Sequence, residues 1–591
     1  MAASWAVRLE RALGAACGAV LATMLALAVV SALLRYAFGT GHVGAEEALA
    51  WLLLGLVCLG FPLVAGGPLS MRIELFAGRA VGPRSVAAEA MVLAACLALV
   101  SAGAKAAFQV GGTSPLLGLG EWVRPAALAA SGAVAFLLRV VVLLGEGRAR
   151  HLMLAACLAF AALVVVASGV STSSMRPSLA AGLVVGAGIV VAAPLPHVFI
   201  LAGYIALAFG SPLVEPALAL SLLAGMGRYL LLAIPFFLLA GGLLIVSGMA
   251  GDLVRFAASL VGARRAGLGQ TVLVTSVLFS GISGSSIANA AFSSKTFLRP
   301  LVANGYAPER AGAIIAATAV LDNIILPSIA FFILAAATNL PVGPLLVGGL
   351  FAGLFLAAAL GLAIRFASGE VAPPPHDPSP RRRLAVRALP VFGLGLIVVA
   401  GIRFGVVTPT EAAGLAAAYT LVAALAARAR PREIASAFRR AGAETAAIVM
   451  LVGAATPLAF LLAVDGVAAS AARLALSLGE SPFMVMLAAN LLLLAAGLVL
   501  DIGAAILLFS PILLPVAVAA GIDPVHFGVI VVVNLMIGGL TPPVGILVQV
   551  VSAATGLPAI RLFRAVLPYL AALLAALLIM SLAVAAHAHF T

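Results

Sequence analysis

Two stretches of this chain place polar and helix-breaking residues inside otherwise apolar sequence, and the second stretch repeats the first. Each contains a Gly-x-x-Pro turn, which begins at Gly305 in one and at Gly521 in the other, and a further proline lies 22 residues beyond that glycine, at Pro327 and Pro543. A shift of 216 positions superimposes the two stretches. Non-helical backbone at membrane depth is tolerated only where protein buries it or where it lines a cavity. Interrupted apolar segments at matching positions of two halves indicate a transporter's binding site. The repeat therefore predicts a chain that moves a solute across a bilayer.

The composition excludes an ordinary soluble protein. Of the 591 residues, 64% are hydrophobic and only 9% are charged, whereas soluble domains carry about 25% charged residues. The mean hydropathy is +1.24, and apolar runs of about 20 residues favour helices over a barrel. The net charge of +13 comes almost entirely from arginine, since Lys105 and Lys295 are the two lysines. This charge indicates loops that face anionic lipid. We expect an all-α polytopic membrane protein that contacts membrane lipid and no nucleic acid.

The four cysteines do not form a metal site in the sequence. Cys17, Cys58, Cys96 and Cys157 each lie in a separate apolar segment, and none has a partner at metal-ligand spacing. Small apolar packing is the usual role of such isolated cysteines. We expect all four to be buried and the chain to carry no metal cofactor.

Charge and hydropathy divide the chain into a small and a large module. Four apolar segments come first, and the arginines in their joints place both ends of this four-helix unit in the cytoplasm. A single fifth apolar segment follows and changes the orientation of what comes after it. The large module has several segments too short to cross a membrane alone, and a Pro- and Arg-rich connector lies between its halves. The predicted divisions are a four-helix scaffold over 1–150, a linking transmembrane helix over 151–177, a transport module over 178–591 and, within it, a linker over 368–387.

The polar residues at the interruptions are the candidate ligands of this chain. A half-helix that ends inside the membrane exposes unpaired backbone groups, so its N-terminal end attracts anions and its carbonyl end attracts cations. Short side-chain oxygens suit a hard ion such as sodium. The candidates in the first half are the hairpin residues Ser283, Ser285, Ser286 and Asn289 and the broken-helix residues Thr318, Asp322 and Asn323. The candidates in the second half are Asp501 in the hairpin and Asn534, Gly538 and Thr541 in the broken helix. For any one of them, the alternative is that a small residue only lets two helices approach closely.

Three strings carry a resemblance to a known family: Gly284–Ala288 (GSSIA), Gly521–Gly528 (GIDPVHFG) and Asn534–Gly545 (NLMIGGLTPPVG). The strings Ile234–Phe237 and Thr408–Ala413 fit the same pattern. Together they resemble the large (DctM-like) membrane subunit of TRAP transporters, the tripartite ATP-independent periplasmic transporters. The first four apolar segments resemble the small (DctQ-like) subunit of that family. The resemblance covers nearly the whole chain.

The resemblance implies a fused permease of the bacterial inner membrane, with inverted repeats, two re-entrant hairpins and two broken helices. It implies elevator-type alternating access coupled to sodium, with sodium ligands among Ser285, Ser286, Asp322 and Asp501. It also implies a separate periplasmic solute-binding protein that delivers a small organic anion, a carboxylate or sulfonate. No enzyme activity, no catalytic residue and no cofactor other than the coupling ion is expected.

The first half departs from the family pattern. Asn289 stands where the family usually has aspartate, and Asp322 and Asn323 stand where it usually has Gly-Pro. Lys295 adds a cation that the family does not usually carry there. In one hypothesis Asp322 rebuilds the first cation site. In a second, Asp322 pairs with Lys295, whose ammonium replaces the ion. In a third, Lys295 reaches to the membrane interface and Asp322 caps the helix that restarts before Pro327.

Two rival functions remain open from the sequence. A stand-alone secondary anion transporter would use similar hairpins without a binding protein. An intramembrane enzyme would need a convergent nucleophile and base, and no serine motif has a membrane histidine placed for it. His197 is expected in a loop, and His526 is expected to be a packing or turn residue. The identity of the anion is not encoded in the motifs.

Overall fold

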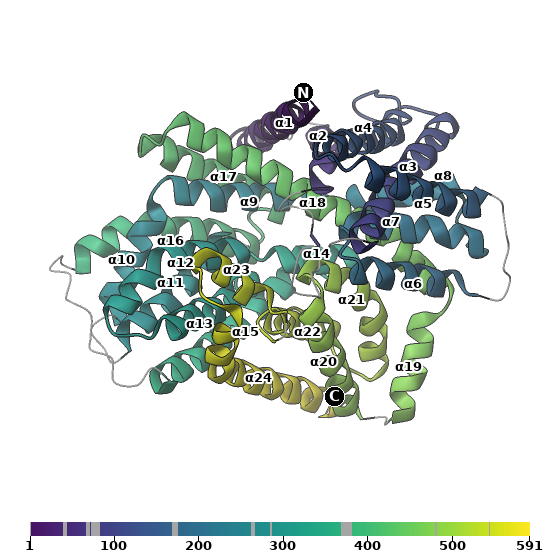
Figure 1. The fold of residues 1–591 in the computed structure, drawn as a ribbon. Coiled ribbons are helices and arrows are strands. Elements are labelled where there is room, and N and C mark those ends of the chain that lie inside the picture. The colour runs from purple at the N-terminus through teal and green to yellow at the C-terminus, as the bar shows by residue number, and fades with distance from the viewer. Residues whose placement is uncertain are drawn as a thin grey trace. The chain divides into compact units, whose positions relative to one another are not determined.

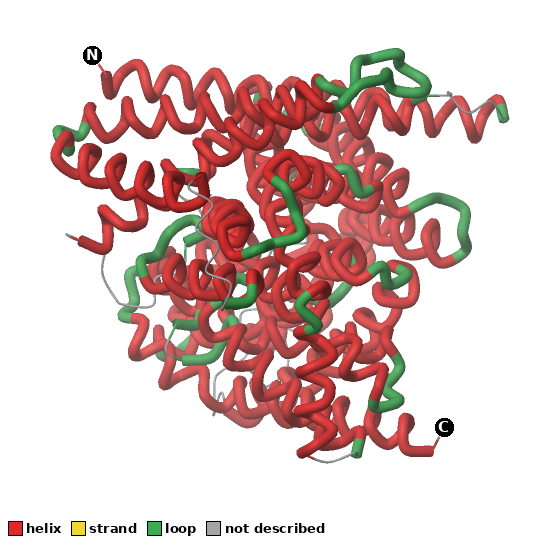
Figure 2. Tube along the Cα trace, turned by 90° about the vertical axis from the view of Figure 1, so that its right-hand side faces the viewer, coloured by secondary structure: helices red, strands yellow, loops and turns green. Residues whose placement is uncertain are grey.

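A computed structural model describes residues 2–39, 44–66, 71–72, 83–167, 175–261, 266–283, 286–367, 381–478, 481–542 and 544–590. Over these residues the chain is built from helices and loops, without a strand, apart from one isolated bridge between Thr113 and Gly120 (Figure 2). Within the same residues, 11 helices are long and apolar enough to cross a membrane. The predicted all-α polytopic membrane fold is confirmed.

The helices pack into two compact units, and unit 1 contains Met1–Pro235 and Ala435–Val467. Its helices are α1 (Ala2–Phe38), α2 (Ala45–Val64), α3 (Pro83–Gln109), α4 (Val123–Gly145), α5 (Ala149–Ala167), α6 (Pro177–Val190), α7 (Leu195–Ala206), η1 (Leu207–Phe209), α8 (Glu215–Met226), η2 (Tyr229–Leu232) and most of α18 (Pro431–Val464) (Figure 1). Unit 1 thus joins the helices of the predicted small module to several helices of the predicted large module. The predicted domain limits concern sequence modules rather than packing, and they stay predictions.

Glycines bring α18 close to α1 and α2 within unit 1. A Cβ added to Gly442 of α18 would lie 3.0 Å from the carbonyl oxygen of Cys17 of α1. A Cβ on Gly60 of α2 would overlap the Cβ of Ala446. Small residues let helix backbones approach in membrane proteins, where lipid offers no hydrophobic drive for helices to associate. Close backbone packing therefore holds α18 against the small-module helices.

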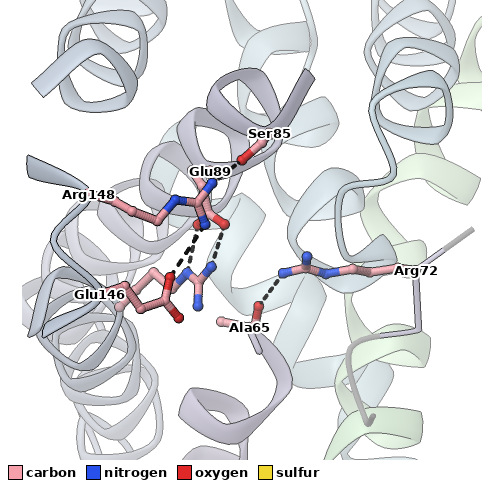
Figure 3. Close-up of polar contacts among 7 residues, drawn as sticks. Ala65, Arg72, Ser85, Glu89, Glu146 and Arg148 are labelled. Atoms are coloured by element: carbon pink, nitrogen blue, oxygen red, sulfur yellow. Dashed lines mark hydrogen bonds and ion pairs between the residues drawn. The ribbon is translucent and has the colours of Figure 1, made fainter. Parts of the chain in front are cut away.

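A cluster of charged residues joins α3 and α4 at one end of the small module (Figure 3). Arg139 of α4 donates from Nε to Glu89 of α3 at 2.6 Å, and the two side chains are only 11% and 5% exposed. Arg148, in the link after α4, donates to the Ser85 hydroxyl of α3 at 2.5 Å (Figure 3). Charge-assisted hydrogen bonds are the strong ones in a protein interior. The cluster fixes how α3 and α4 pack.

Two further contacts join the small-module helices to α7 and α8. Lys105 of α3 forms an ion pair with Glu215, which opens α8 and also accepts a hydrogen bond from the Tyr204 hydroxyl of α7 at 3.2 Å. His197 lies in the first turn of α7, fully buried, and stacks on Phe61 of α2 with ring centroids 4.6 Å apart. The expectation that His197 lies in a loop is wrong, because its ring is a packing surface between helices.

The cysteine prediction is wrong at one position. Cys17, Cys58 and Cys96 are buried, as expected, but Cys157 of α5 is exposed. Its neighbours Met153 and Phe160 on α5 are also exposed, at 63% and 66%. An apolar face left uncovered on a membrane helix is suited to lipid contact, so apolar sequence there does not mean burial within protein.

Unit 2 contains Phe236–Ile434 and Ala468–Thr591. Its helices are most of α9 (Ala233–Val246), α10 (Met249–Val261), α11 (Gly267–Ser283), α12 (Ser286–Ala303), α13 (Pro308–Thr318), η3 (Ala319–Asn323), α14 (Ile329–Thr338), α15 (Val342–Ala367), α16 (Arg381–Arg403), α17 (Pro409–Ala426), α19 (Val467–Leu478), α20 (Pro482–Val499), α21 (Ile502–Ala519), α22 (Pro524–Gly538), α23 (Ile546–Thr555) and α24 (Ala559–Phe590). Of the predicted linker, the part over 368–380 lies outside the described residues, and the remainder belongs to the start of α16.

The duplication seen in the sequence recurs in the helices of unit 2. The five helices α11 to α15 and the five helices α20 to α24 begin 215 to 217 residues apart, pair by pair. The two sets also contact each other reciprocally: α12 packs against α23, and its counterpart α21 packs against α14. Helices α20, α22 and α24 lie side by side (Figure 1). The opposite orientation of the two halves in the membrane stays a prediction.

Candidate functional site

The first hairpin is formed by α11 and α12, and residues 284–285 between them lie outside the described residues. Ser285 is therefore not placed, and Ser283 is placed only as the last residue of α11, without its side chain. Ser286 opens α12 and is buried. Within the described residues its hydroxyl has no hydrogen-bond partner. A buried hydroxyl at the start of a helix, next to an interruption, is a suitable ligand for an ion or a substrate oxygen.

Asn289 joins the two arms of this hairpin. It is fully buried on α12, its Nδ2 donates to the Ser276 hydroxyl of α11 at 3.3 Å, and its Oδ1 accepts from the Ser293 hydroxyl at 2.9 Å. The neutral amide thus has partners of its own at the position where the family usually has a carboxylate. Sequence reasoning missed both serines. The signal for Ser293 was its spacing of four residues from Asn289, which places both on one helix face.

The first broken helix consists of α13, the tight turn η3 and α14. Thr318 ends α13, and its hydroxyl donates to the carbonyl oxygen of Ile314 at 2.9 Å within its own helix. Asp322 and Asn323 lie in η3 and are buried, at 0% and 9% exposed. Because η3 packs against both α11 and α12, the structure brings these two residues to the first hairpin.

The cap of the restarting helix α14 is Ser328, not Asp322. The Ser328 hydroxyl accepts from the backbone N–H of Phe331 at 3.4 Å and donates to the carbonyl oxygen of Asn323. The interpretation of Asp322 as the cap is wrong, because a serine at the standard N-cap position supplies that bond. The fully buried carboxyl group of Asp322, seven residues before α14 begins at Ile329, is left for another role.

The structure does not bring Lys295 to Asp322. Lys295 is exposed on α12, while Asp322 is fully buried, and the described residues show no ion pair between them. This placement fits the hypothesis in which the long lysine side chain reaches toward an interface. It does not support the hypothesis in which the ammonium replaces a bound cation.

The second hairpin carries its carboxylate directly at the interruption. Helix α20 ends at Val499 and α21 begins at Ile502, so the backbone break predicted here is present. Asp501 is the N-cap of α21, and its Oδ2 accepts from the backbone N–H of Gly503 at 3.0 Å. The helix N-terminus stabilises the negative charge. The carboxylate has further lone pairs, so it can cap the helix and still coordinate a cation.

Asn534 lies at one end of a polar network that joins three helices of the second half. It is fully buried on α22, and its Nδ2 donates to the backbone oxygen and to Oδ1 of Asn490 on α20, at 3.0 and 2.8 Å. Asn490 donates in turn to the Ser581 hydroxyl of α24 at 2.8 Å. Sequence reasoning missed Asn490 and Ser581. An asparagine inside an 18-residue apolar helix was the available signal, because polar residues at membrane depth are functional by default.

The remaining two candidates have clear structural roles. A Cβ on Gly538 would lie 2.7 Å from the Cα of Gly497, so these glycines let α22 and α20 touch through their backbones. The Thr541 hydroxyl donates to the carbonyl oxygen of Ile537 at 2.8 Å. For Gly538, close approach alone explains the residue type. Pro543 lies outside the described residues.

Contacts of η3 connect the candidate residues of the two halves. This turn, which holds Asp322 and Asn323, packs against α22, the helix of Asn534, as well as against the first hairpin. This region therefore combines helix interruptions, buried amides and hydroxyls, and the Asp322 carboxyl group, while Asp501 lies at the interruption of the second hairpin. Such a donor set can hold a hard cation through oxygen ligands, and helix N-termini beside it can hold an anionic group.

Two family models match this chain. Residues 152–586 match the model described as tripartite ATP-independent periplasmic transporter, DctM component. Residues 24–150 match the DctQ component of the same transporters. The DctM match alone spans most of the chain. The chain belongs to the TRAP transporter family. It carries both membrane components in one polypeptide, and it is a multi-pass protein of the inner membrane.

Several curated TRAP permeases are similar to this one. The C4-dicarboxylate TRAP transporter large permease protein DctM of Pseudomonas aeruginosa is 37% identical over 387 residues, which cover 64% of this chain and 90% of that protein. The sialic acid TRAP transporter large permease protein SiaM of Vibrio cholerae is 33% identical over 60% of this chain and 84% of that protein. The isethionate TRAP transporter permease protein DctMQ of Oleidesulfovibrio alaskensis is 33% identical over 59% of this chain and 56% of that protein.

Proposed function

We propose that this TRAP permease imports a small organic anion together with sodium, by an elevator movement of the transport module. The observation that carries the proposal is the duplicated set of helix interruptions in unit 2, with buried oxygen ligands beside them. Asp501 at one interruption and Asp322 at the other supply the two carboxyl groups. Opposed half-helix ends can hold an anion and a cation at once.

Sodium fits the donor set better than a transition metal does. The buried side chains at the interruptions are hydroxyls, amides and carboxyls, and hard ions prefer such oxygen ligands. Asp501 supplies a formal negative charge at the second hairpin. In the first half, Asp322 supplies the charge that Asn289 cannot, and its helix turn packs against that hairpin.

An anionic cargo is supported by the relatives and by helix chemistry. The similar permeases named above act on C4-dicarboxylates, sialic acid and isethionate, according to their names. Carboxylate and sulfonate groups are the feature that these compounds share. Backbone N–H groups at half-helix N-termini form a cradle for such groups. A periplasmic solute-binding protein would deliver the anion, as the name of the family implies.

Unit 1 is suited to the role of a scaffold. Its small-module helices are joined to α7, α8 and α18 by an ion pair, a buried ring stack and close glycine packing. Unit 2 contains the paired interruptions. An elevator movement needs one rigid part and one part that carries the ligands. In this proposal unit 1 is the rigid part and unit 2 is the part that carries the ligands.

Uptake into proteoliposomes tests the proposal. The purified chain is reconstituted, and a periplasmic solute-binding protein of a TRAP transporter is added with radioactive succinate, sialic acid or isethionate. We expect accumulation of one anion when a sodium gradient is imposed, and none when choline replaces sodium at fixed pH. Full uptake in choline would refute sodium coupling.

The same assay separates the alternative functions. Uptake that needs no binding protein would indicate a stand-alone secondary anion transporter. An intramembrane enzyme would convert the anion, so chromatography of the vesicle contents would show a product. We expect the transported anion to be recovered unchanged.

A further inference from the structure

The side-chain amide of Asn534 has occupied hydrogens and an unoccupied oxygen within the described part of unit 2. Asn534 is fully buried on α22, and its Nδ2 donates twice to Asn490 of α20. Its Oδ1 is buried as well, but it has no hydrogen-bond partner among the residues that the structure describes. A buried polar atom without a partner costs free energy, so native proteins rarely keep one without a reason. This oxygen is therefore available to a ligand.

The backbone carbonyl of Asn490 fixes which way the Asn534 amide faces. A carbonyl oxygen can only accept a hydrogen bond, so the Asn534 atom that lies 3.0 Å from it must be the nitrogen. The second N–H of this nitrogen needs another acceptor, which is Oδ1 of Asn490 at 2.8 Å. Nδ2 of Asn490 is then the donor to the Ser581 hydroxyl of α24, also at 2.8 Å. This assignment of donors and acceptors leaves Oδ1 of Asn534 outside the network.

The chemistry of this oxygen favours a cation over an anionic cargo. An amide oxygen carries lone pairs and no hydrogen, so it repels the oxygens of a carboxylate or sulfonate and attracts a positive charge. Amide carbonyl oxygens are regular ligands of hard cations. Helix α22 packs against η3, the turn that contains the buried Asp322. A neutral ligand and a carboxyl group are therefore present on two adjoining elements.

The first half of unit 2 has an oxygen of the same character without such a network. The 216-residue shift places Thr318 opposite Asn534 and Val274 opposite Asn490. The Thr318 hydroxyl donates its one hydrogen to the carbonyl oxygen of Ile314 in its own helix, at 2.9 Å, so its oxygen keeps lone pairs for a ligand. A threonine is thus oriented by its own helix, whereas an asparagine at this position needs partners on other helices.

We propose that Asn490 and Ser581 are positioning residues, which hold the Asn534 oxygen in place as a ligand of the coupling cation. Neither of them contacts the cation. Helices α20, α22 and α24 pack against one another (Figure 1), so the network fixes the ligand from two neighbouring helices. The inference rests on the sodium coupling proposed above and adds to it a neutral ligand and the two residues that orient this ligand.

Equilibrium binding of radioactive sodium to the full chain in nanodiscs tests the inference. Asn534→Leu removes the ligand oxygen, so we expect a dissociation constant for sodium about tenfold higher. Asn490→Leu and Ser581→Ala keep that oxygen but loosen it, and each should raise the constant about threefold. Gln270→Leu is the matched control, because it breaks a bond of 2.7 Å from a side-chain amide to the carbonyl oxygen of Gly361, outside this network. The control should bind sodium as the unchanged chain does.

The variant Asn534→Thr separates positioning from a purely structural role of Asn490. It copies the residue of the first half, whose hydroxyl is oriented by its own helix. We expect Asn534→Thr to bind sodium, and we expect Asn490→Leu to have no further effect on the affinity in this background. A purely structural role of Asn490 would instead shift the affinity equally in both backgrounds, and this result would overturn the inference.

The outcomes also separate this inference from the function on which it rests. Absence of saturable sodium binding by the unchanged chain would refute the proposed coupling and the inference together. Saturable binding by the unchanged chain, with the same affinity in Asn534→Leu, would overturn the inference alone. Thermal unfolding of each variant shows whether it is folded. If Asn534→Leu does not fold, the comparison of Asn490→Leu in the two backgrounds decides.

Discussion

Units 1 and 2 both bury polar side chains, but they place them differently along their helices. In unit 1, Glu89 and Arg139 lie within continuous helices of 27 and 23 residues, where each is the other's partner. In unit 2, the buried Asp322 and the half-buried Asp501 lie where helices stop. In a continuous helix the backbone N–H and C=O groups bond to each other within the helix. A buried charged side chain there needs only one partner of opposite charge. At an interruption, backbone and side-chain oxygens are both available, and this leaves capacity for an ion.

The longest helices of unit 1 also differ in length from the helices that flank the interruptions of unit 2. Helices α1 and α18 have 37 and 34 residues, whereas α14 and α23 have 10 each. At a rise of about 1.5 Å per residue, 10 residues span roughly half of a hydrocarbon core of about 30 Å. The ends of these short helices must find partners inside the membrane. This difference indicates a structural role for buried charge in unit 1 and a ligand-binding role in unit 2.

Glu89→Ala should have the largest effect on stability. It leaves Arg139 buried without its partner, which costs about 3–5 kcal/mol for an ion pair of this kind. Denaturant titration in nanodiscs measures the loss. The double variant Glu89→Met with Arg139→Met should recover most of it, because a buried pair can be replaced by apolar groups of similar volume. A loss below about 1 kcal/mol for Glu89→Ala would remove the structural role assigned to unit 1.

Asp501→Asn should have the largest effect on transport, a fall of about a hundredfold in sodium-driven uptake. Asparagine keeps the helix cap but removes the charge that a cation needs, and a charged ligand is worth about 1.5–3 kcal/mol per contact. Asp523→Asn is the matched control, since Asp523 is also an N-cap and lies outside the candidate site. If both variants lose uptake equally, Asp501 is only a cap and the comparison between the units fails.

Gly538→Ala should affect stability and transport together. The added Cβ would lie 2.7 Å from the Cα of Gly497, and backbone cannot move aside as a flexible side chain can. We expect a loss of about 1–3 kcal/mol, the cost of overpacking, with reduced uptake because α20 and α22 both belong to the site. Gly343→Ala is the control, because a Cβ there meets nothing within 4 Å. Normal uptake by Gly538→Ala would show that this close approach has no part in transport.

Lys105→Met should have the smallest effect. The ion pair with Glu215 has a lysine side chain that is 56% exposed, and exposed pairs contribute about 0–1 kcal/mol. We expect a change in unfolding free energy within that range and unchanged uptake. A double-mutant cycle with Glu215→Gln isolates the pair energy. A coupling well above 1 kcal/mol would show that surface charge, and not only buried charge, holds unit 1 together.

The sequence alone was sufficient to predict those structural features that depend only on residues close together in the chain. The break at Asp501, the Gly-x-x-Pro turns and the 216-residue repeat depend on residues that disrupt a helix in any context, so their positions could be predicted from the chain alone. The family resemblance then supplied the fused arrangement of the two membrane components, which the family models confirm.

Partners that come from distant segments could not be predicted. Asn490 contacts Asn534 across 44 residues and Ser581 across 91, and nothing in the apolar sequence around it specifies either contact. His197 was misplaced for the same reason, since Phe61 covers its ring. Ser328, a local signal, was overlooked in favour of Asp322, although it occupies the ordinary capping position before α14.

The central claim is that the interruptions of unit 2 hold a coupling cation. Equilibrium binding of radioactive sodium to the purified chain in nanodiscs tests it most directly. The account predicts saturable binding by the unchanged chain and by Asp523→Asn, and loss of binding in Asp501→Asn. Absence of saturable sodium binding by the unchanged chain, or equal binding by the two variants, would contradict it.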